Sequence, residues 1–262
     1  MRARSTLFTL YTELVYPDDT VWIGQLVHWM EMLGFSEPAV RAAVSRSAAR
    51  GWVIPERKGR RAYYRLSPRV YWQVRQVRRR LCEMNDAPWD RLWRILVYAV
   101  PEGLRSQRDK FRNELVLLGY GTPAPGVWVS PTADLEATRE LVRYYELEPY
   151  VELFRAERAG GQPEDQLVAR AFHLEEAQRR YAALEAQMDA LPPDPDAERA
   201  FVELVRLVHE ARKVLFFDPG LPPELAPAGF NGAGVLARFS RERARLREAA
   251  RRLIPDARQP VH

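Results

Sequence analysis

Between residues 36 and 52, small and apolar side chains recur at the spacing of an α-helix. Val40, Val44 and Ala48 stand four positions apart, so they share one face of the predicted helix. Ser36 can accept backbone N–H bonds as the N-cap of this helix, and Gly51 is typical of a residue just past the end of one. The sequence therefore predicts a helix with one apolar face and defined ends.

Polar side chains of this helix lie off the apolar face, and they include Arg41, Ser45 and Arg46. Two short strands are predicted directly after it, over residues 52–54 and 62–66. Each feature alone is more often a solvent-exposed helix or turn. A helix followed by a hairpin with a basic tip is, however, the pattern of a winged helix-turn-helix, whose helix enters the major groove of DNA.

The turn of the predicted hairpin contains Gly59, which suits the positive φ of a tight turn. We predict that its cations contact phosphates or the minor groove, and that the helix reads base edges. The predicted DNA-binding residues are Arg41, Ser45, Arg46, Arg57, Lys58, Arg60 and Arg61.

Helices are predicted before this region over residues 5–15 and 24–33, with a short strand or the beginning of a helix at residues 20–23. A basic helix is predicted after it, over residues 71–84. Its arginines either extend the DNA-binding surface or belong to a solvated connector between domains, and the pattern does not decide between the two. They are Arg75, Arg78, Arg79 and Arg80.

The pattern changes again after Pro88. Strands are predicted at residues 92–100 and 149–156, with two short strands across a Pro/Gly turn within residues 119–131, and helices are predicted at 107–118 and 135–145. The resulting order, β-α-β-β-α-β, is that of a ferredoxin-like domain. From Pro163 the chain reads as helices over 165–191, 196–217 and 235–253.

The predicted fold class is therefore α+β, with an N-terminal winged helix-turn-helix, a central ferredoxin-like βαββαβ domain and a C-terminal helical domain. The predicted division places the winged helix in residues 1–70 and a basic helical linker in 71–88. The ferredoxin-like domain then spans residues 89–160, and the helical domain spans 161–262.

Charge and composition support a DNA partner. The net charge of the 262-residue chain is +5, and the positive excess lies in residues 1–84, whereas the remainder is net negative. Cys82 is the single cysteine, so the chain has no intrachain disulfide. No apolar run is long enough to span a bilayer and no secretory signal is recognisable at Met1, so we expect a cytoplasmic protein without a membrane partner.

Three groups of residues, in the same order along the chain, resemble the signatures of the PaaX family of bacterial repressors of phenylacetate-degradation genes. The first group is residues 40–46, 50–52 and 59–66, the second is 119–121 and 124–131, and the third is 209–212 and 218–222. The chain departs from the family pattern at Ala211 and Phe230, where tryptophan is expected, and at Ser47, where leucine is expected. The resemblance implies a homodimer that binds a palindromic operator and is released by an aryl-CoA thioester such as phenylacetyl-CoA.

A CoA thioester needs cations for its phosphates and an apolar slot for its acyl group. The sequence offers Arg105 and Arg108 near a helix start, and it offers Tyr120, Trp128, Tyr181 and Arg212 near family signatures. The alternative is structural: Tyr120 and Trp128 are core residues, and Arg212 pairs with Asp218.

Motifs of catalysis are missing from the sequence. The four histidines have no metal-binding spacing, and there is neither a G-x-S-x-G elbow nor a phosphate-binding glycine pattern. We therefore expect a protein that is not an enzyme and has no cofactor or metal site. The alternative is a metal-dependent nuclease, because the central domain resembles the small CRISPR adaptation subunit. Some of those subunits use an aspartate at the end of the first strand, where this chain has Tyr98-Ala99-Val100-Pro101. A third class is an interaction scaffold that does not bind DNA.

Overall fold

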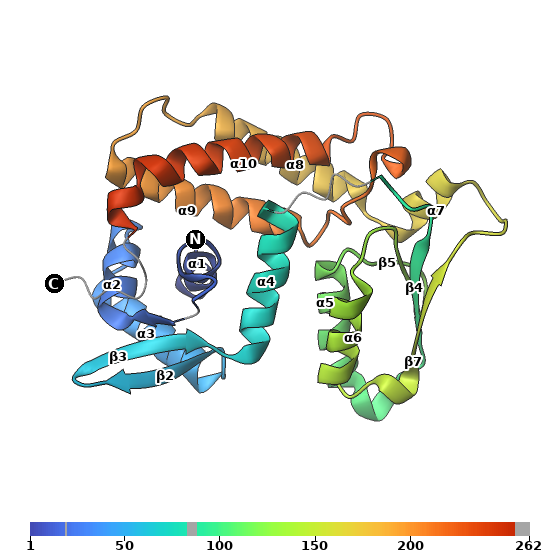
Figure 1. The fold of residues 1–262 in the computed structure, drawn as a ribbon, viewed down its shortest axis with the longest axis horizontal. Helices are drawn as coiled ribbons and strands as arrows, with labels where there is room; N and C mark the ends of the chain where they lie inside the picture. Colours follow the sequence, from blue (N-terminus) through green and yellow to red (C-terminus); the bar gives the residue numbers. More distant parts are fainter. Residues whose placement is uncertain (19, 83–87, 255–262) are drawn as a thin grey trace. The chain divides into compact units, whose positions relative to one another are not determined.

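The computed structural model describes residues 1–18, 20–82 and 88–254 (Figure 1). It combines helices with two antiparallel sheets, which confirms the predicted α+β class. The chain divides into two compact units. Unit 1 consists of Met1–Glu83, Ala186–Arg212 and Ala237–His262, and unit 2 consists of Met84–Glu185 and Lys213–Leu236.

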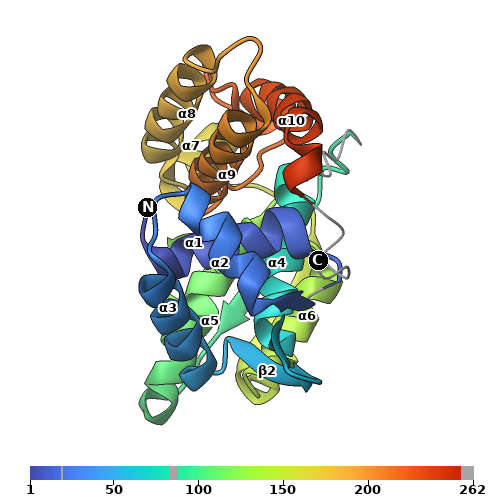
Figure 2. The same cartoon turned by 90° about the vertical axis from the view of Figure 1, so that its left-hand side faces the viewer.

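Unit 1 begins with helix α1 (Ala3–Leu10), which continues into a π-helical turn (Tyr11–Val15). Strand β1 (Thr20–Trp22), α2 (Ile23–Met32) and α3 (Glu37–Ala49) follow, and then the hairpin of β2 (Val53–Lys58) and β3 (Arg61–Leu66). The strands form a sheet in the order β1-β3-β2. Helices α1, α2 and α3 pack on one another (Figure 2), because their apolar faces enclose Leu10, Leu26 and Val40.

Helix α3 has the apolar face that the sequence predicts. Its buried residues are Val40, Ala43, Val44 and Ser47. Ser36 stands at the N-cap position, but its side chain makes no capping hydrogen bond, so this part of the prediction is wrong. The C-terminal end is as expected, because Gly51 adopts a φ of +68° that suits glycine.

The predicted basic helix is α4 (Pro68–Cys82), which begins three residues earlier than expected. Val70, Val74 and Val77 are buried along one stripe of α4 and hold it in unit 1. Residues 83 and 84 of the predicted helix lie outside the described part of the chain.

Polar contacts fasten the N-terminal elements of unit 1 to the C-terminal ones. Glu13, almost fully buried, accepts hydrogen bonds from Arg243 Nε at 2.7 Å and Arg247 Nη1 at 2.9 Å. Trp29 Nε1 donates to the carbonyl of Leu253 at 3.0 Å. Parts of α9 (Ala197–Val214) and α10 (Gly232–Ala249) therefore belong to the same unit as the first helices.

Unit 2 contains β4 (Trp93–Tyr98), α5 (Arg105–Leu117), β5 (Gly121–Ala124) and β6 (Val127–Ser130), followed by α6 (Leu135–Tyr144) and β7 (Val151–Ala156). Its sheet has the order β5-β6-β4-β7, with antiparallel neighbours throughout. Helices α5 and α6 lie side by side on one face of the sheet (Figure 1), where Leu96 of β4 is fully buried.

The helix predicted over residues 165–191 is two helices, α7 (Glu164–Ala171) and α8 (Leu174–Asp189). The prediction is wrong at Phe172, which is extended with φ −126° and ψ 138°. Its ring is buried in a cluster with Trp93, Val129 and Leu225. This packing overrides the local helical pattern, because the chain has to turn there to bring α7 against β5.

Candidate nucleic-acid interface

The predicted base-reading residues lie together on the outer face of α3. Arg41, Ser45 and Arg46 are all exposed, whereas the opposite face of the helix is buried. This orientation follows from the helical repeat, which puts polar and apolar positions of residues 40–47 on opposite sides. The three side chains are therefore available to a partner outside the protein.

Ion pairing differs along this face. Arg41 Nε bonds Glu37 Oε1 at 2.7 Å, and both side chains are about half exposed. Such exposed i,i+4 pairs contribute only about 0.3–0.5 kcal/mol, so a phosphate or base could displace Glu37 at small cost. In the part of the chain that the structure describes, Ser45 and Arg46 have no side-chain hydrogen bond or ion pair.

The hairpin tip presents cations on aromatic supports. Lys58 and Arg61 are directly opposite each other across the hairpin. Lys58 Nζ lies 5.1 Å from the centroid of the Tyr63 ring, and the Arg61 guanidinium lies 5.1 Å from that of Trp22. Cation–π contact offsets part of the repulsion between two like charges placed opposite each other. The remaining repulsion favours the arrival of an anion.

Arg57 and Arg60 complete the basic tip. Both side chains are exposed, and neither has an ion-pair partner among the described residues. Gly59 between Lys58 and Arg60 has a φ of +63°, as the first position of a two-residue hairpin turn of type II′ requires. The structure thus places the four predicted cations around one turn.

The aromatic rings that support these cations were not predicted from the sequence. Trp22 is in β1, and it lies next to Tyr63 because β1 pairs with β3. Nothing local in the sequence connects residue 22 with residue 61. The contact between Arg61 and Trp22 could have been found only from the pairing of β1 with β3 and its register.

The arginines of α4 do not form one exposed stripe. Arg78 Nη1 donates to the carbonyl of Thr12 at 2.9 Å, and its guanidinium lies 5.3 Å from the Tyr16 ring centroid. Arg78 therefore ties α4 to the end of the first helix, which agrees with a connecting role. A contribution of Arg75, Arg79 and Arg80 to DNA binding stays a prediction.

Of the candidate effector residues, Tyr120 and Trp128 are buried in unit 2. The hydroxyl of Tyr120 shares a hydrogen bond of 3.1 Å with Thr138, and burial raises the pKa of Tyr120 to about 12. The Arg112 guanidinium lies 6.0 Å from the Trp128 ring centroid. Both aromatic residues thus have the environment of core side chains.

The candidate phosphate-binding arginines lie at the beginning of α5. Arg105 and Arg108 both pair with Glu102, at 3.5 Å and 3.1 Å. Arg105 is largely exposed, whereas Arg108 is mostly covered. A phosphate there would have to compete with the carboxylate of Glu102.

Tyr181 and Arg212 belong to different units. In unit 2, Tyr181 donates to Asp218 Oδ2 at 2.6 Å. In unit 1, Arg212 Nε donates to Thr9 Oγ1 and Nη2 to the carbonyl of Ser5, both at 2.9 Å. Burial lowers the pKa of Arg212 to about 10. Asp218 thus accepts a hydrogen bond from Tyr181 within unit 2, whereas the alternative pairing of Arg212 with Asp218 would join the two units and stays a prediction.

The glycines of the middle signature have a packing role. Gly119 has a φ of +84°, and a Cβ atom on it would lie 2.6 Å from the carbonyl oxygen of Pro219. A Cβ atom on Gly121 would lie 2.4 Å from the ring of Phe172. Only glycine allows this approach, so the signatures at 119–121 and 218–222 pack on each other inside unit 2.

Two negative observations concern residues 1–18, 20–82 and 88–254. No three His, Cys, Asp or Glu side chains gather there closely enough to hold a metal ion. Within the same residues, no helix is long and apolar enough to cross a membrane.

Comparison with known proteins covers almost the whole chain. Residues 2–70 match the family model of PaaX-like proteins, residues 86–168 match the PaaX protein central Cas2-like domain, and residues 172–255 match the PaaX-like protein C-terminal domain. The transcriptional repressor PaaX of Escherichia coli K12 is 30% identical over 240 residues, which cover 87% of this chain and 75% of that protein. An uncharacterized protein from Mycobacterium tuberculosis has a similar fold, with a TM-score of 0.57, 21% identity, and coverage of 96% of this chain and 98% of its own.

Proposed function

The chain belongs to the PaaX family, and on that premise we propose that it is a transcriptional repressor that binds operator DNA through unit 1. The observation that carries this proposal is the exposed basic face of α3 beside a hairpin whose tip gathers four cations. Its relative in Escherichia coli bears the name of a transcriptional repressor.

We assign α2, α3 and the β2–β3 hairpin to a winged helix-turn-helix. The order of elements, the sheet order β1-β3-β2 and the tight turn at Gly34, with a φ of +87°, support the assignment. In this arrangement Arg41, Ser45 and Arg46 contact base edges in the major groove. The cations of the hairpin contact phosphates or the minor groove, so they supply affinity and salt dependence rather than specificity.

We assign the sheet of unit 2 to a ferredoxin-like domain, because its strands occur in the order second, third, first, fourth along the sheet. In this proposal the repressor is a homodimer, as the family resemblance implies. Two copies of α3 then read two half-sites separated by about one turn of DNA, roughly 34–36 Å, or a multiple of it.

Release from the operator by an aryl-CoA thioester, phenylacetyl-CoA above all, is the remaining part of the proposal, and it rests on the family resemblance. The thioester would favour a dimer geometry with the wrong spacing between the two recognition helices. A tenfold change in the ratio of two states needs only about 1.4 kcal/mol of differential binding, so a small rearrangement is enough.

The alternative function is a metal-dependent nuclease built on unit 2, and the description of its matching family model as Cas2-like gives it a specific basis. The end of β4 and the residues after it, Tyr98-Ala99-Val100-Pro101, contain no carboxylate for a metal. Cleavage of DNA or RNA by purified protein in the presence of Mg²⁺ or Mn²⁺ would support the nuclease.

The test of the repressor is binding of the purified protein to DNA from its own gene neighbourhood, followed by fluorescence anisotropy with and without phenylacetyl-CoA. We expect binding at least a hundredfold tighter than to random DNA of equal length, as specific repressors show. We also expect phenylacetyl-CoA to abolish it and an equimolar mixture of phenylacetate and CoA to leave it intact.

Equal affinity for the two DNAs would contradict the repressor. Binding that is specific but insensitive to the thioester would leave the DNA-binding function in place and remove phenylacetyl-CoA as effector.

A further inference from the structure

Two cations near the C-terminal end of α3 lie outside the set that was predicted to contact DNA. Arg50 is the residue that caps α3 at this end, and Arg4 is in the first turn of α1, which packs on α3. Both side chains are exposed, and neither has an ion-pair partner within residues 1–18, 20–82 and 88–254. Two like charges without a counter-charge favour an anionic partner.

Arg4 is stacked on an aromatic ring whose backbone is fixed. Its guanidinium lies 4.8 Å from the centroid of the Trp52 ring. The N–H of Trp52 donates to the carbonyl of Ser47, and the carbonyl of Trp52 accepts from the N–H of Ser67, both at 2.9 Å. Trp52 is therefore held both by α3 and by the residue that follows β3. A stacked arginine keeps the N–H edge of its guanidinium open, and phosphate oxygens match that edge.

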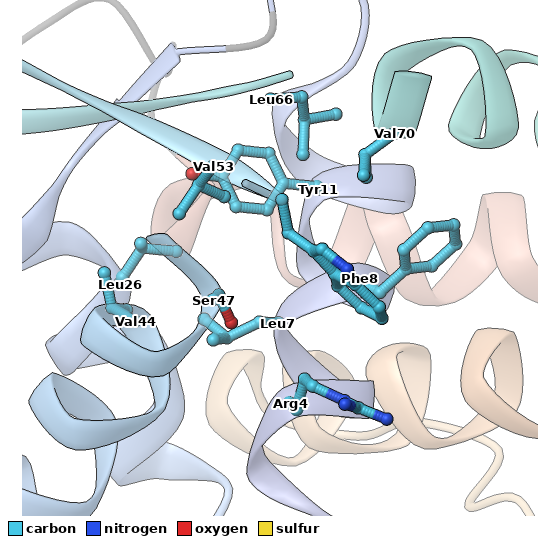
Figure 3. Close-up of a pocket in the computed structure, with 11 residues that line it drawn as sticks. Arg4, Leu7, Phe8, Tyr11, Leu26, Val44, Ser47, Val53, Leu66 and Val70 are labelled. Atoms are coloured by element: carbon cyan, nitrogen blue, oxygen red, sulfur yellow. The ribbon is translucent and has the colours of Figure 1, made fainter. Parts of the chain in front are cut away.

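The first turn of α1 is held in unit 1 by α9. Arg212 of α9 donates from Nε to Thr9 Oγ1 and from Nη2 to the carbonyl of Ser5, both at 2.9 Å. Figure 3 shows the side chain of Arg4 extending away from Val44, which lies in the apolar interior of unit 1. Because Ser5 follows Arg4 directly, these bonds fix the point from which the Arg4 side chain leaves the surface.

Arg50 continues the face of α3 that carries Arg46. The two residues stand four positions apart, and the N–H of Arg50 donates to the carbonyl of Arg46 at 3.2 Å. At 1.5 Å per residue, Arg50 lies about 6 Å farther along the helix axis, which is half of the roughly 12 Å width of the major groove. With α3 lying across the groove and Arg46 at the bases in its middle, Arg50 reaches the backbone at its edge.

We propose that Arg4, stacked on Trp52, and Arg50 form a third DNA contact, in addition to the outer face of α3 and the hairpin tip. This third contact binds phosphates of the strand that borders the major groove at the C-terminal end of α3. It contributes affinity and salt dependence, but no discrimination between sequences. The inference rests on the proposed function, because it requires α3 to lie in the groove.

The test is fluorescence anisotropy of the full chain on operator and random DNA over a series of salt concentrations, with Arg4→Met and Arg50→Met made separately. Methionine removes the charge and keeps an unbranched apolar side chain. Each variant is expected to lower the slope of log Kobs against log salt by about 0.9 on both DNAs, which is about an eightfold loss of affinity at 0.1 M salt relative to 1 M. The matched control Arg241→Met, at an exposed position of α10 in the same unit, leaves the slope unchanged.

Three outcomes would overturn the proposal. The first is an unchanged slope in either Arg4→Met or Arg50→Met. The second is a fall in Arg241→Met as large as theirs, which would mean that net charge rather than contact governs binding. The third is a loss on the operator with none on random DNA, because a phosphate contact is the same on both.

Trp52 is a positioning residue, and its role is tested by coupling to Arg4. In a Trp52→Leu background, Arg4→Met is expected to cost about threefold at 0.1 M salt instead of eightfold, whereas Arg50→Met costs the same in both backgrounds. Trp52→Phe, which keeps a ring under the guanidinium, is expected to restore the larger cost of Arg4→Met. An equal cost of Arg4→Met in all three backgrounds would overturn the support by Trp52. If Trp52→Leu does not fold, the slopes of the two single variants still decide the contact.

Failure of the repressor function gives a different result from failure of the third contact. A parent protein that binds no DNA at low salt would contradict the repressor. A parent that binds DNA, and whose slope falls when Arg60 and Arg61 are replaced but not in Arg4→Met or Arg50→Met, would overturn the third contact alone.

Discussion

The double substitution of Arg60 and Arg61 by alanine tests the hairpin as a phosphate-binding element. Each phosphate neutralised by a cation contributes about 0.9 to the slope of log Kobs against log salt, so the loss of two contacts lowers the slope by about 1.8. Each contact therefore raises the binding constant at 0.1 M salt, relative to that at 1 M salt, by a factor of roughly 8. The double variant is therefore expected to bind DNA about 60-fold more weakly at 0.1 M salt, and about as well as the parent near 1 M.

The structure predicts that this change leaves the fold intact. Arg60 is exposed. Among the described residues, the contact that Arg61 would lose is that with the Trp22 ring, and Arg61 faces the like charge of Lys58. The matched control is Arg241→Ala with Arg251→Ala. Both arginines are exposed and belong to the same unit, Arg251 pairs with the exposed Glu248, and the two substitutions remove the same charge.

The assay is fluorescence anisotropy of operator and random DNA over a series of salt concentrations. We expect the slope to fall for both DNAs in the hairpin variant and to stay nearly unchanged in the control. An unchanged slope in the hairpin variant would mean that the hairpin does not contact DNA. An equal fall in the control would mean that net charge, rather than contact, governs binding.

Three further changes test other parts of the structure. Arg46→Ala should lose about 1–3 kcal/mol on the operator and little on random DNA, and an equal loss on both in anisotropy would make it a phosphate contact. Glu13→Gln should lower the free energy of urea unfolding by about 3 kcal/mol, because it leaves buried charge on α10 unpaired, whereas Glu248→Gln at the exposed pair with Arg251 should change it by less than about 1 kcal/mol. Similar losses of unfolding free energy in the two variants would contradict the explanation from burial. Asp90 has a pKa lowered from 3.8 to about 2, chiefly because Arg94 donates hydrogen bonds to it. Its stabilisation is complete above about pH 5 and falls as the pH drops through 2. Asp90→Asn should therefore cost about 0.5–1 kcal/mol at pH 6 and only a small part of that near pH 2, and an equal cost at both pH values in urea unfolding would contradict it.

Local patterns predicted most elements of the fold. The face of α3 and the glycine turn of the hairpin follow from side-chain spacing and from the backbone freedom of Gly59, and both are encoded within a few residues. The break at Phe172 could not be predicted from local pattern. The ring of Phe172 packs against Gly121, which lies some fifty residues earlier in the chain. Ser36 stands at the predicted cap position without the capping hydrogen bond, and the packing around it does not explain the difference.

The candidate interface was predictable in its charges but not in its supports. Arg61 is visible as a cation in the sequence, whereas its contact with Trp22 depends on the pairing of β1 with β3. The burial of Tyr120 and Trp128 was left open for a related reason. An aromatic residue in a glycine-rich stretch suits a ligand pocket as well as a core, and only the packing of α5 and α6 on the sheet distinguishes them.

The contacts of Glu13 and Trp29 with the last helical segments have a consequence for biosynthesis. Glu13 is bonded to a residue 230 positions later, and at about 5–20 residues per second the ribosome needs roughly 10–50 s to deliver it. During that time the first helices have emerged with a carboxylate that still lacks its arginines. We expect limited proteolysis of stalled nascent chains to cut α1 and α2 readily until α10 has left the exit tunnel. The N-terminal helices then become protected last, although they are made first.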